Sequence, residues 1–348
     1  MEHQLTSGAI DTVTSIWQRV LARPCVSIED PFFDVGGDPS SAIRLFAEVA
    51  KEFGRELPPE TIYQAPTVAS LAALLENPSK PLLPPLSLLK AGSEAPPVFI
   101  AHGLGGSILE FFPVVRHIQS SRPIYGIQAK GTDGLQDPLD RIEDMAQFYL
   151  DAIREVQPRG PYLLIGYSLG GLVTLEMAQR LSARGEKVAL LAMLDAYPFR
   201  SYLPFSQRVK LMSRRARYHA SIARKLPARQ AVTYFLNPAQ RQAHNSVERQ
   251  RDAGQLSGMI ARAAARVRDS ANLALLRYRP RFYDGTIKFV KAEIESEFPD
   301  DPVAVWSKLT REFEVETVPG DHQGILNTHF ESLASVLSRY LREASARI

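Results

Sequence analysis

YLLIGYSLGG, residues 162–171, is the most informative stretch of this sequence. It begins as an apolar run of the kind that forms a buried strand, and the segment that follows, GLVTLEMAQRLSARG, predicts a helix. Between them lies Gly166-Tyr167-Ser168-Leu169-Gly170, a G-x-S-x-G pattern. On a tight strand-to-helix turn a serine hydroxyl is raised above the sheet as a nucleophile. The alternative is an incidental serine in a glycine-rich turn, and the flanking strand and helix favour the nucleophile.

A serine hydroxyl needs a base to remove its proton, and the base needs a carboxylate to orient it. Asp195 ends the next strand, KVALLAMLD, which places it at the same edge of the sheet as Ser168. His322 follows the last strand, in VPGDHQGIL. The order Ser, acid, His matches one known arrangement of a catalytic triad. Asp321 is a rival carboxylate, but adjacent side chains seldom point the same way, so we prefer Asp195.

The developing oxyanion needs two N–H donors. The turn predicts the N–H of Leu169 as one donor, and the loop AHGLGG after an earlier strand predicts the N–H of Leu104 as the other. We interpret His102, in the same loop, as a residue that structures the loop and not as a second base.

Strands and helices alternate around this motif, from VFIAHG to the closing helical segment GILNTHFESLASVLSRYLREA. Strands apolar on both faces predict an α/β fold with a mostly parallel sheet covered on both sides. Residues 198–280 interrupt the alternation with helical, arginine-rich sequence, which predicts a lid insertion. Aromatic residues in or beside this insertion could line a pocket or belong to the core: Tyr197, Phe199, Phe205 and Tyr234.

The first part of the chain has a different character. Residues 5–77 predict four short helices, one of them the amphipathic segment SAIRLFAEVAKEFG. Residues 78–97 carry six prolines and predict a linker. The predicted organisation is therefore a small helical domain over 5–77, a linker over 78–97 and a large α/β domain over 98–345.

Composition narrows the class of protein. The chain has 348 residues, 45% hydrophobic and 23% charged, and no apolar run near the ~20 residues of a membrane helix. We expect no membrane insertion, no nucleic-acid partner and no metal, because no corresponding motif is present. A single cysteine, Cys25, excludes an internal disulfide; we expect it to be buried and the protein to be cytoplasmic.

Charge is unevenly distributed along the chain. Residues 200–280 hold 17 Lys and Arg but 3 Asp and Glu, whereas residues 1–80 hold 6 and 11. The basic segment can form solvated helix faces, or it can attract an acidic carrier domain, a phosphate-bearing cofactor or a membrane surface.

Residues 97–343 resemble the type I thioesterase domains that end nonribosomal peptide and polyketide synthetases. The resemblance is carried by VFIAHGLGGS, GYSLGG, the aspartate of AMLDAYP, the helical insertion and GDHQGIL. It implies the α/β-hydrolase fold and an acyl-Ser168 intermediate, released by water, by an internal nucleophile or by an external amine.

Residues 5–77 resemble the peptidyl or acyl carrier domains that precede such thioesterases. PFFDVGGDPSSAIRLFAEV is similar to their phosphopantetheine attachment region, but Pro39 stands where the family has its serine. Two interpretations follow from the resemblance. Either Ser40 carries 4′-phosphopantetheine from a shifted position, or the domain is unmodified and docks partners.

Three functions are compatible with these patterns. The first is a serine thioesterase that unloads acyl or peptidyl chains from a carrier in the same chain, mostly by hydrolysis. In the second, the first domain is a docking module, and the hydrolase edits acyl groups or acts in trans on carrier or synthetase proteins. The third is an acyl-CoA or ester hydrolase, or an acyl-transferring or amide-forming enzyme. The missing attachment serine favours substrate arriving from another protein, and the chain could be free-standing or a fragment of a synthetase.

Overall fold

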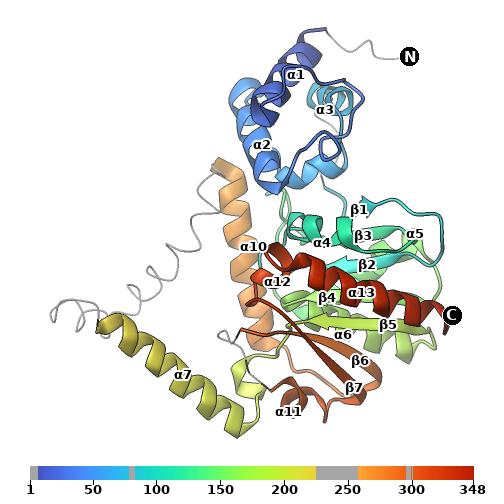
Figure 1. Ribbon diagram of the computed structural model, residues 1–348, viewed down its shortest axis with the longest axis vertical. Helices are drawn as coiled ribbons and strands as arrows, with labels where there is room; N and C mark the ends of the chain where they lie inside the picture. Colours follow the sequence, from blue (N-terminus) through green and yellow to red (C-terminus); the bar gives the residue numbers. More distant parts are fainter. Residues whose placement is uncertain (1–6, 78–82, 225–257, 295–298, 300) are drawn as a thin grey trace.

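The computed structural model describes residues 7–77, 83–224, 258–294, 299 and 301–348 (Figure 1). The N-terminal part is a small helical module. Its core gathers around Trp17, Phe32 and Phe46, each at most 2% exposed. The expected helices are present, and the third is a 3-10 helix: α1 (Ser7–Leu21), α2 (Pro39–Phe53), η1 (Pro59–Tyr63) and α3 (Val68–Glu76).

A seven-stranded sheet forms the second part, in the order β1-β3-β2-β4-β5-β6-β7. Only the edge strand β1 among these is antiparallel to its neighbour; the other pairings are parallel. This is the mostly parallel sheet that the sequence predicts. The strands are β1 (Leu86–Lys90), β2 (Val98–Ala101), β3 (Ile124–Ile127), β4 (Tyr162–Tyr167), β5 (Val188–Leu194), β6 (Tyr283–Ala292) and β7 (Thr310–Val318).

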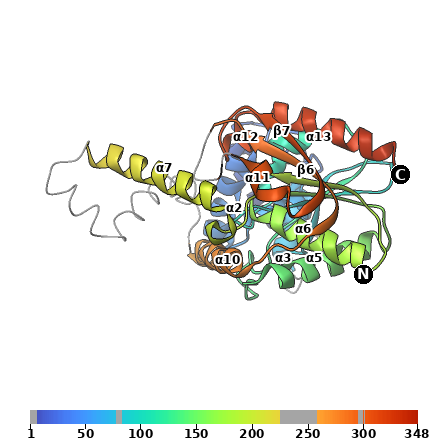
Figure 2. The ribbon, with the colours of Figure 1, turned by 90° about the horizontal axis from the view of Figure 1, so that it is seen from below.

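Helices cover both faces of the sheet, and Figure 2 shows the two layers on opposite sides. One layer contains α5 (Ile142–Val156) and α6 (Leu169–Ala183). The other contains α4 (Phe112–His117), α12 (Gly324–Asn327) and α13 (Phe330–Ser345), with η2 (Leu109–Phe111) before α4. Because both faces are covered, β4 is buried along its whole length, as its uninterrupted apolar sequence requires.

Two helices of the predicted insertion, α7 (Phe205–Ala223) and α10 (Gly258–Arg277), fall within the described residues; residues 225–257, with Tyr234, do not. α7 projects away from the sheet in both views, whereas α10 runs beside it and its first turn reaches the N-terminal module (Figures 1 and 2). Ala271 and Ala274 of α10 are buried in the same core cluster as residues of α5 and α6. Two short elements, η3 (Arg200–Tyr202) and α11 (Pro302–Trp306), complete this end of the fold.

Four expectations need correction. The linker predicted over residues 78–97 contains β1, an edge strand that can follow prolines directly because edge positions tolerate them. Cys25 is exposed, because it lies in the turn after α1 and not in a helix face. The predicted closing helix is divided into α12 and α13 at Thr328 and His329. Phe205 is 78% exposed and so belongs neither to the core nor to an enclosed pocket, whereas Tyr197 lies in the core, one of the two places expected for it.

Across the residues that the structure describes, we find no helix that combines the length and the apolar character needed to cross a bilayer.

Candidate active site

Ser168 occupies the turn between β4 and α6 in a conformation rare for a residue with a side chain, φ 53° and ψ −117°. The flanking glycines make this turn possible. A Cβ atom on Gly166 would lie 2.2 Å from the Gly170 carbonyl oxygen, and one on Gly170 would lie 2.4 Å from the oxygens of Ala101 and His102. The sharp turn thus leaves Ser168 half-exposed at the carboxyl edge of the sheet, while its neighbours are buried.

The structure brings Ser168, His322 and Asp195 into one hydrogen-bonded line. The His322 Nε2 atom lies 3.1 Å from the Ser168 Oγ atom, and the His322 Nδ1 atom lies 2.8 Å from the Asp195 Oδ2 atom. Since a carboxylate only accepts, Nδ1 carries the proton and Nε2 is free to accept the Ser168 hydroxyl. Asp195 is 3% exposed, so the carboxylate acts in a poorly solvated environment. Its backbone φ is 45°, a second strained position at this site.

The rival carboxylate, Asp321, is exposed and points elsewhere. Its Oδ1 atom accepts a hydrogen bond of 2.7 Å from the N–H of Gly324, at the start of α12. Asp321 therefore binds the first N–H of the helix that follows the histidine loop, whereas Asp195 binds the His322 ring.

Tyr167 is a site residue that the sequence analysis missed. Its ring stacks on the His322 ring, with centroids 4.8 Å apart and planes at 22°. Its hydroxyl donates to the His322 carbonyl oxygen at 2.7 Å. Burial, then the nearby carboxylates Glu110, Asp195 and Asp321, raise the pKa of Tyr167 far above its ordinary value, so the hydroxyl keeps its proton. Position 167 is a variable position of the G-x-S-x-G pattern, and no local signal marks its role.

The loop after β2 contains the candidate oxyanion donor Leu104, and its first residue, His102, lies against Gly170 in the first turn of α6. Glu110 fixes this loop, because its Oε1 atom accepts a hydrogen bond of 2.8 Å from the N–H of Gly103. His102 lies 1% exposed beneath the loop, with Nδ1 2.5 Å from the Gly103 oxygen and Nε2 2.6 Å from the Tyr149 hydroxyl. These contacts agree with His102 as a loop-structuring residue.

Burial shifts the pKa values of Glu110 and His102 so that each group favours its uncharged form. Burial raises the pKa of Glu110 to about 7, although the hydrogen bond from Gly103 opposes the shift. Burial lowers the pKa of His102 to about 4. A carbonyl can only accept, so Nδ1 of neutral His102 is the protonated nitrogen and Nε2 accepts from Tyr149. Between about pH 4 and pH 7 the loop is therefore held mainly by uncharged groups, and Glu110 ionises as the pH rises through about 7.

The other predicted site residue, Ser40, lies in the N-terminal module at the second position of α2. Pro39 is the first residue of the helix and offers no hydroxyl. Ser41 is buried, and Asp38 and Ser41 form a capping box in which the Ser41 N–H donates to the Asp38 Oδ1 atom at 2.6 Å. Ser40 is exposed. Of the two serines, only Ser40 thus presents a hydroxyl that could hold a phosphopantetheine arm.

In the described part of the chain, no group of three or more His, Cys, Asp or Glu side chains is arranged to hold a metal ion.

Family models match both parts of the chain. Residues 96–341 match the thioesterase domain, and residues 11–75 match the phosphopantetheine attachment site. The first match includes Ser168, Asp195 and His322, and the second includes Pro39, Ser40 and Ser41.

Similar proteins are large synthetases. A dimodular nonribosomal peptide synthase of Bacillus subtilis is 39% identical over 198 residues, which are 57% of this chain and 8% of that protein. Indigoidine synthase of Dickeya dadantii is 36% identical over 194 residues, 56% of this chain and 12% of that protein. The chain thus spans a small fraction of the length of the curated relatives it matches.

Solved structures match the fold. A four-domain nonribosomal peptide synthetase, crystallised in its holo form with AMP and glycine, matches with a TM-score of 0.61 at 25% identity, over 97% of this chain and 26% of that one. The NocB thioesterase domain, in a covalent complex with a fluorophosphonate nocardicin G analogue, matches with a TM-score of 0.54 at 18% identity, over 71% of this chain and 95% of that one.

Proposed function

Because this chain belongs to the thioesterase domain family and carries a phosphopantetheine attachment domain ahead of it, we propose that it releases an acyl or peptidyl chain from a carrier thioester, by hydrolysis, through an acyl-Ser168 intermediate. The observation that carries the proposal is the line of hydrogen bonds from Asp195 through His322 to Ser168. In this proposal residues 5–77 are the carrier-like domain and residues 98–345 are the hydrolase.

In the first half-reaction, His322 Nε2 takes the proton of Ser168 as its oxygen attacks the thioester carbonyl carbon. Asp195 holds the imidazole in position and stabilises its positive charge. The N–H groups of Leu104 and Leu169 donate to the tetrahedral oxyanion, and each such donor is worth roughly 3 kcal/mol. The carbon–sulfur bond then breaks, and His322 gives its proton to the departing thiolate.

In the second half-reaction, His322 removes a proton from water, and the resulting hydroxide attacks the acyl-Ser168 carbonyl carbon. Collapse of this second intermediate returns the proton to the Ser168 oxygen and releases the carboxylic acid. A bound phosphopantetheine arm supplies the thiol that presents the acyl group as a thioester; the hydrolase residues supply the rest.

The test uses the full chain and a fluorophosphonate probe, with intact mass spectrometry and thioester turnover as readouts. We expect one probe per chain on Ser168, and loss of both labelling and turnover in Ser168→Ala. Ser206→Ala, which removes an exposed serine in α7, is the matched control and should behave as wild type. Undiminished labelling of Ser168→Ala would exclude this nucleophile. Mass spectrometry of the products separates hydrolysis, which gives a carboxylic acid, from transfer to an alcohol, which gives an ester, or to an amine, which gives an amide.

A second candidate function is hydrolysis in trans, on carriers of other proteins or on acyl-CoA. Pro39 at the family's attachment position favours it, since the usual hydroxyl is absent. Incubation with CoA and a phosphopantetheinyl transferase, followed by mass spectrometry, distinguishes the two routes. Addition of the arm that is lost in Ser40→Ala but retained in Ser41→Ala supports release in cis, whereas an unmodified chain that still hydrolyses acyl-CoA or acyl carriers supports action in trans.

A further inference from the structure

The N-terminal module contacts the hydrolase through the segment Glu56-Leu57-Pro58-Pro59-Glu60, which joins α2 to η1. The acidic residues at its two ends contact different parts of the hydrolase. Glu60, 4% exposed, accepts a hydrogen bond from the Ser107 hydroxyl. Glu56 accepts from the N–H groups of Met259 and Ile260, in the first turn of α10. The carboxylate of Glu56 thus satisfies N–H groups that a helix leaves unpaired at its start.

Ser107 ends the loop that contains the candidate oxyanion donor Leu104. The same loop is held at Gly103 by Glu110. At Gly106 it lies against α10, because a Cβ atom there would be 2.7 Å from a methyl group of Val267. The loop is therefore fixed from three directions, by Glu110, by α10 and by Glu60 of the N-terminal module. Two of these supports depend on the module, since Glu56 also holds the start of α10.

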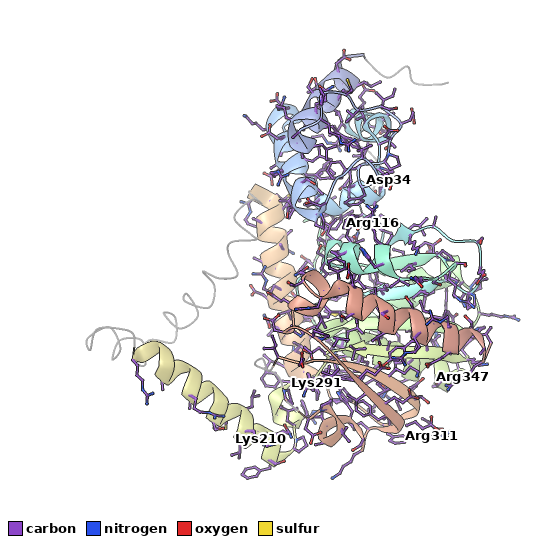
Figure 3. All side chains as sticks on the ribbon, in the orientation of Figure 1. Asp34, Arg116, Lys210, Lys291, Arg311 and Arg347 are labelled. Carbon is purple, nitrogen blue, oxygen red and sulfur yellow. The ribbon has the colours of Figure 1, made fainter. Side chains whose placement is uncertain are left out.

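Apolar contacts surround these polar ones. Leu109 of the hydrolase, 5% exposed, is buried in the core cluster of the N-terminal module. The rings of Phe33 and Phe112 lie 4.3 Å apart, and the Arg116 Nη1 atom donates to the Phe33 carbonyl oxygen at 2.9 Å. Arg116 and the neighbouring Asp34 mark the two sides of this junction in Figure 3. Release of the module would expose these apolar groups and would leave the half-buried Ser107 and the buried Glu60 to find new partners.

We propose that the segment Glu56–Glu60 is a positioning element of the hydrolase: Glu60, through Ser107, fixes the loop that presents the Leu104 N–H, and Glu56 fixes the start of α10 over that loop. The N-terminal module is then a fixed part of the hydrolase active site and not only a carrier-like domain. This inference rests on the proposed thioesterase function, because it assigns the contact an effect on the chemical step.

The experiment measures kcat and KM of the full chain for a short acyl thioester of a small thiol, which needs no carrier. Glu60→Ala and Ser107→Ala each remove one side of the same hydrogen bond. We expect each to lower kcat about tenfold with KM within about twofold, because a small displacement of an aligned donor affects the transition state more than the ground state. Glu60→Gln keeps an acceptor for Ser107 and should restore kcat to within about twofold of wild type.

Two further variants make the result specific. The double variant Glu60→Ala/Ser107→Ala should be no slower than Ser107→Ala, since that substitution already removes the hydrogen bond to Glu60 together with the one that Ser107 Oγ accepts from the Leu109 N–H. Glu52→Ala, at an exposed position of α2 in the same module, is the control and should leave kcat unchanged. Thermal unfolding checks that each variant is folded, and Ser107→Ala carries the test if Glu60→Ala fails to fold.

A folded Ser107→Ala or Glu60→Ala with wild-type kcat, or fully additive losses in the double variant, would overturn the positioning role. Fluorophosphonate labelling of wild-type Ser168 separates this failure from failure of the proposed function. If Ser168 of the wild type is labelled but the Glu60 substitutions leave kcat unchanged, only the positioning role is excluded. If Ser168 of the wild type is not labelled, the proposed thioesterase function itself is excluded.

Discussion

Two glycine-containing turns in this molecule each lead into a helix with a serine at or near its start, and they differ in what surrounds the serine. GGDPSS leads into α2, and GYSLGG leads into α6. Ser168 adopts a positive φ, and its Oγ atom meets His322. Ser41 instead completes a capping box with Asp38.

A serine at a helix start is therefore reactive or structural according to its backbone conformation and its hydrogen-bond partner. The capping box satisfies N–H groups at the start of α2 from within the segment, so the cap itself is made by local hydrogen bonds. At Ser168 no side-chain cap is formed; the strained turn is supported by distant elements, such as the loop around His102 that packs on Gly170. The turn at Ser168 therefore depends on distant parts of the fold, whereas the side-chain cap at Asp38 is made within its own turn.

The largest effect is expected from His322→Ala, which leaves the strained turn in place but removes the base. We expect kcat for thioester hydrolysis to fall about ten-thousandfold, since an unassisted serine hydroxyl is a poor nucleophile. Steady-state kinetics measure this, with Asp321→Ala as the adjacent-residue control that should retain most activity. Full turnover by folded His322→Ala would show that Ser168 is activated by another group, and the contrast between the two turns would lose its chemical basis.

A smaller effect, on stability, is expected from Glu110→Gln. The pKa of Glu110 is raised by burial from 4.5 to about 7 in the folded protein. A raised carboxyl pKa gives stability that is fully present below about pH 4.5 and is lost as the pH rises through about 7, an effect of about 3 kcal/mol. Glutamine keeps the acceptor for the Gly103 N–H but cannot ionise.

Urea unfolding across pH 4 to 8 gives the free energies of unfolding of wild type and Glu110→Gln. Their difference isolates the contribution of Glu110, because the opposite contribution of His102 is common to both proteins. The variant should gain about 3 kcal/mol relative to wild type between the acidic and the neutral end. Glu155→Gln, at an exposed position of α5, should show no such change. A pH-independent difference for Glu110→Gln would mean that the carboxyl has an ordinary pKa, and that the loop at Gly103 is not held by a neutral group.

The sequence predicts those parts of the molecule that leave a local pattern. The parallel sheet follows from apolar strands alternating with helices, and the meeting of Ser168, Asp195 and His322 follows from their places after successive strands at one sheet edge. Both can be predicted from the sequence, because residues that follow the carboxyl ends of parallel strands lie close together at one edge of the sheet.

The rest depends on contacts between distant residues, which leave no periodic signal. The hydrogen bond between Glu60 and Ser107 joins residues 47 positions apart, and that between Tyr167 and the His322 oxygen joins residues 155 apart. β1 escaped prediction because five residues after a run of prolines resemble a linker until a partner strand is known. Cys25 was misjudged for a related reason: the tendency of cysteine to be buried did not apply in a turn.

The smallest effect is expected from Asp38→Ala, which removes the cap of α2 and tests the other side of the comparison. Loss of an N-cap side chain should lower the free energy of unfolding by about 1 kcal/mol. Burial opposes ionisation of Asp38, but hydrogen bonds from Ser41 and the charge of Arg44 outweigh it, so its pKa lies below 3.8. The stabilisation is therefore present above about pH 4 and is lost as the pH falls through the lowered pKa, where wild type and variant should converge. Urea unfolding measures the difference, with exposed Glu29→Ala as control.

Because the cap of α2 is made within its own segment, kcat of Asp38→Ala for a small-thiol thioester should stay within about twofold of wild type. A large fall in kcat would show that the start of α2, like the turn at Ser168, is coupled to the chemistry.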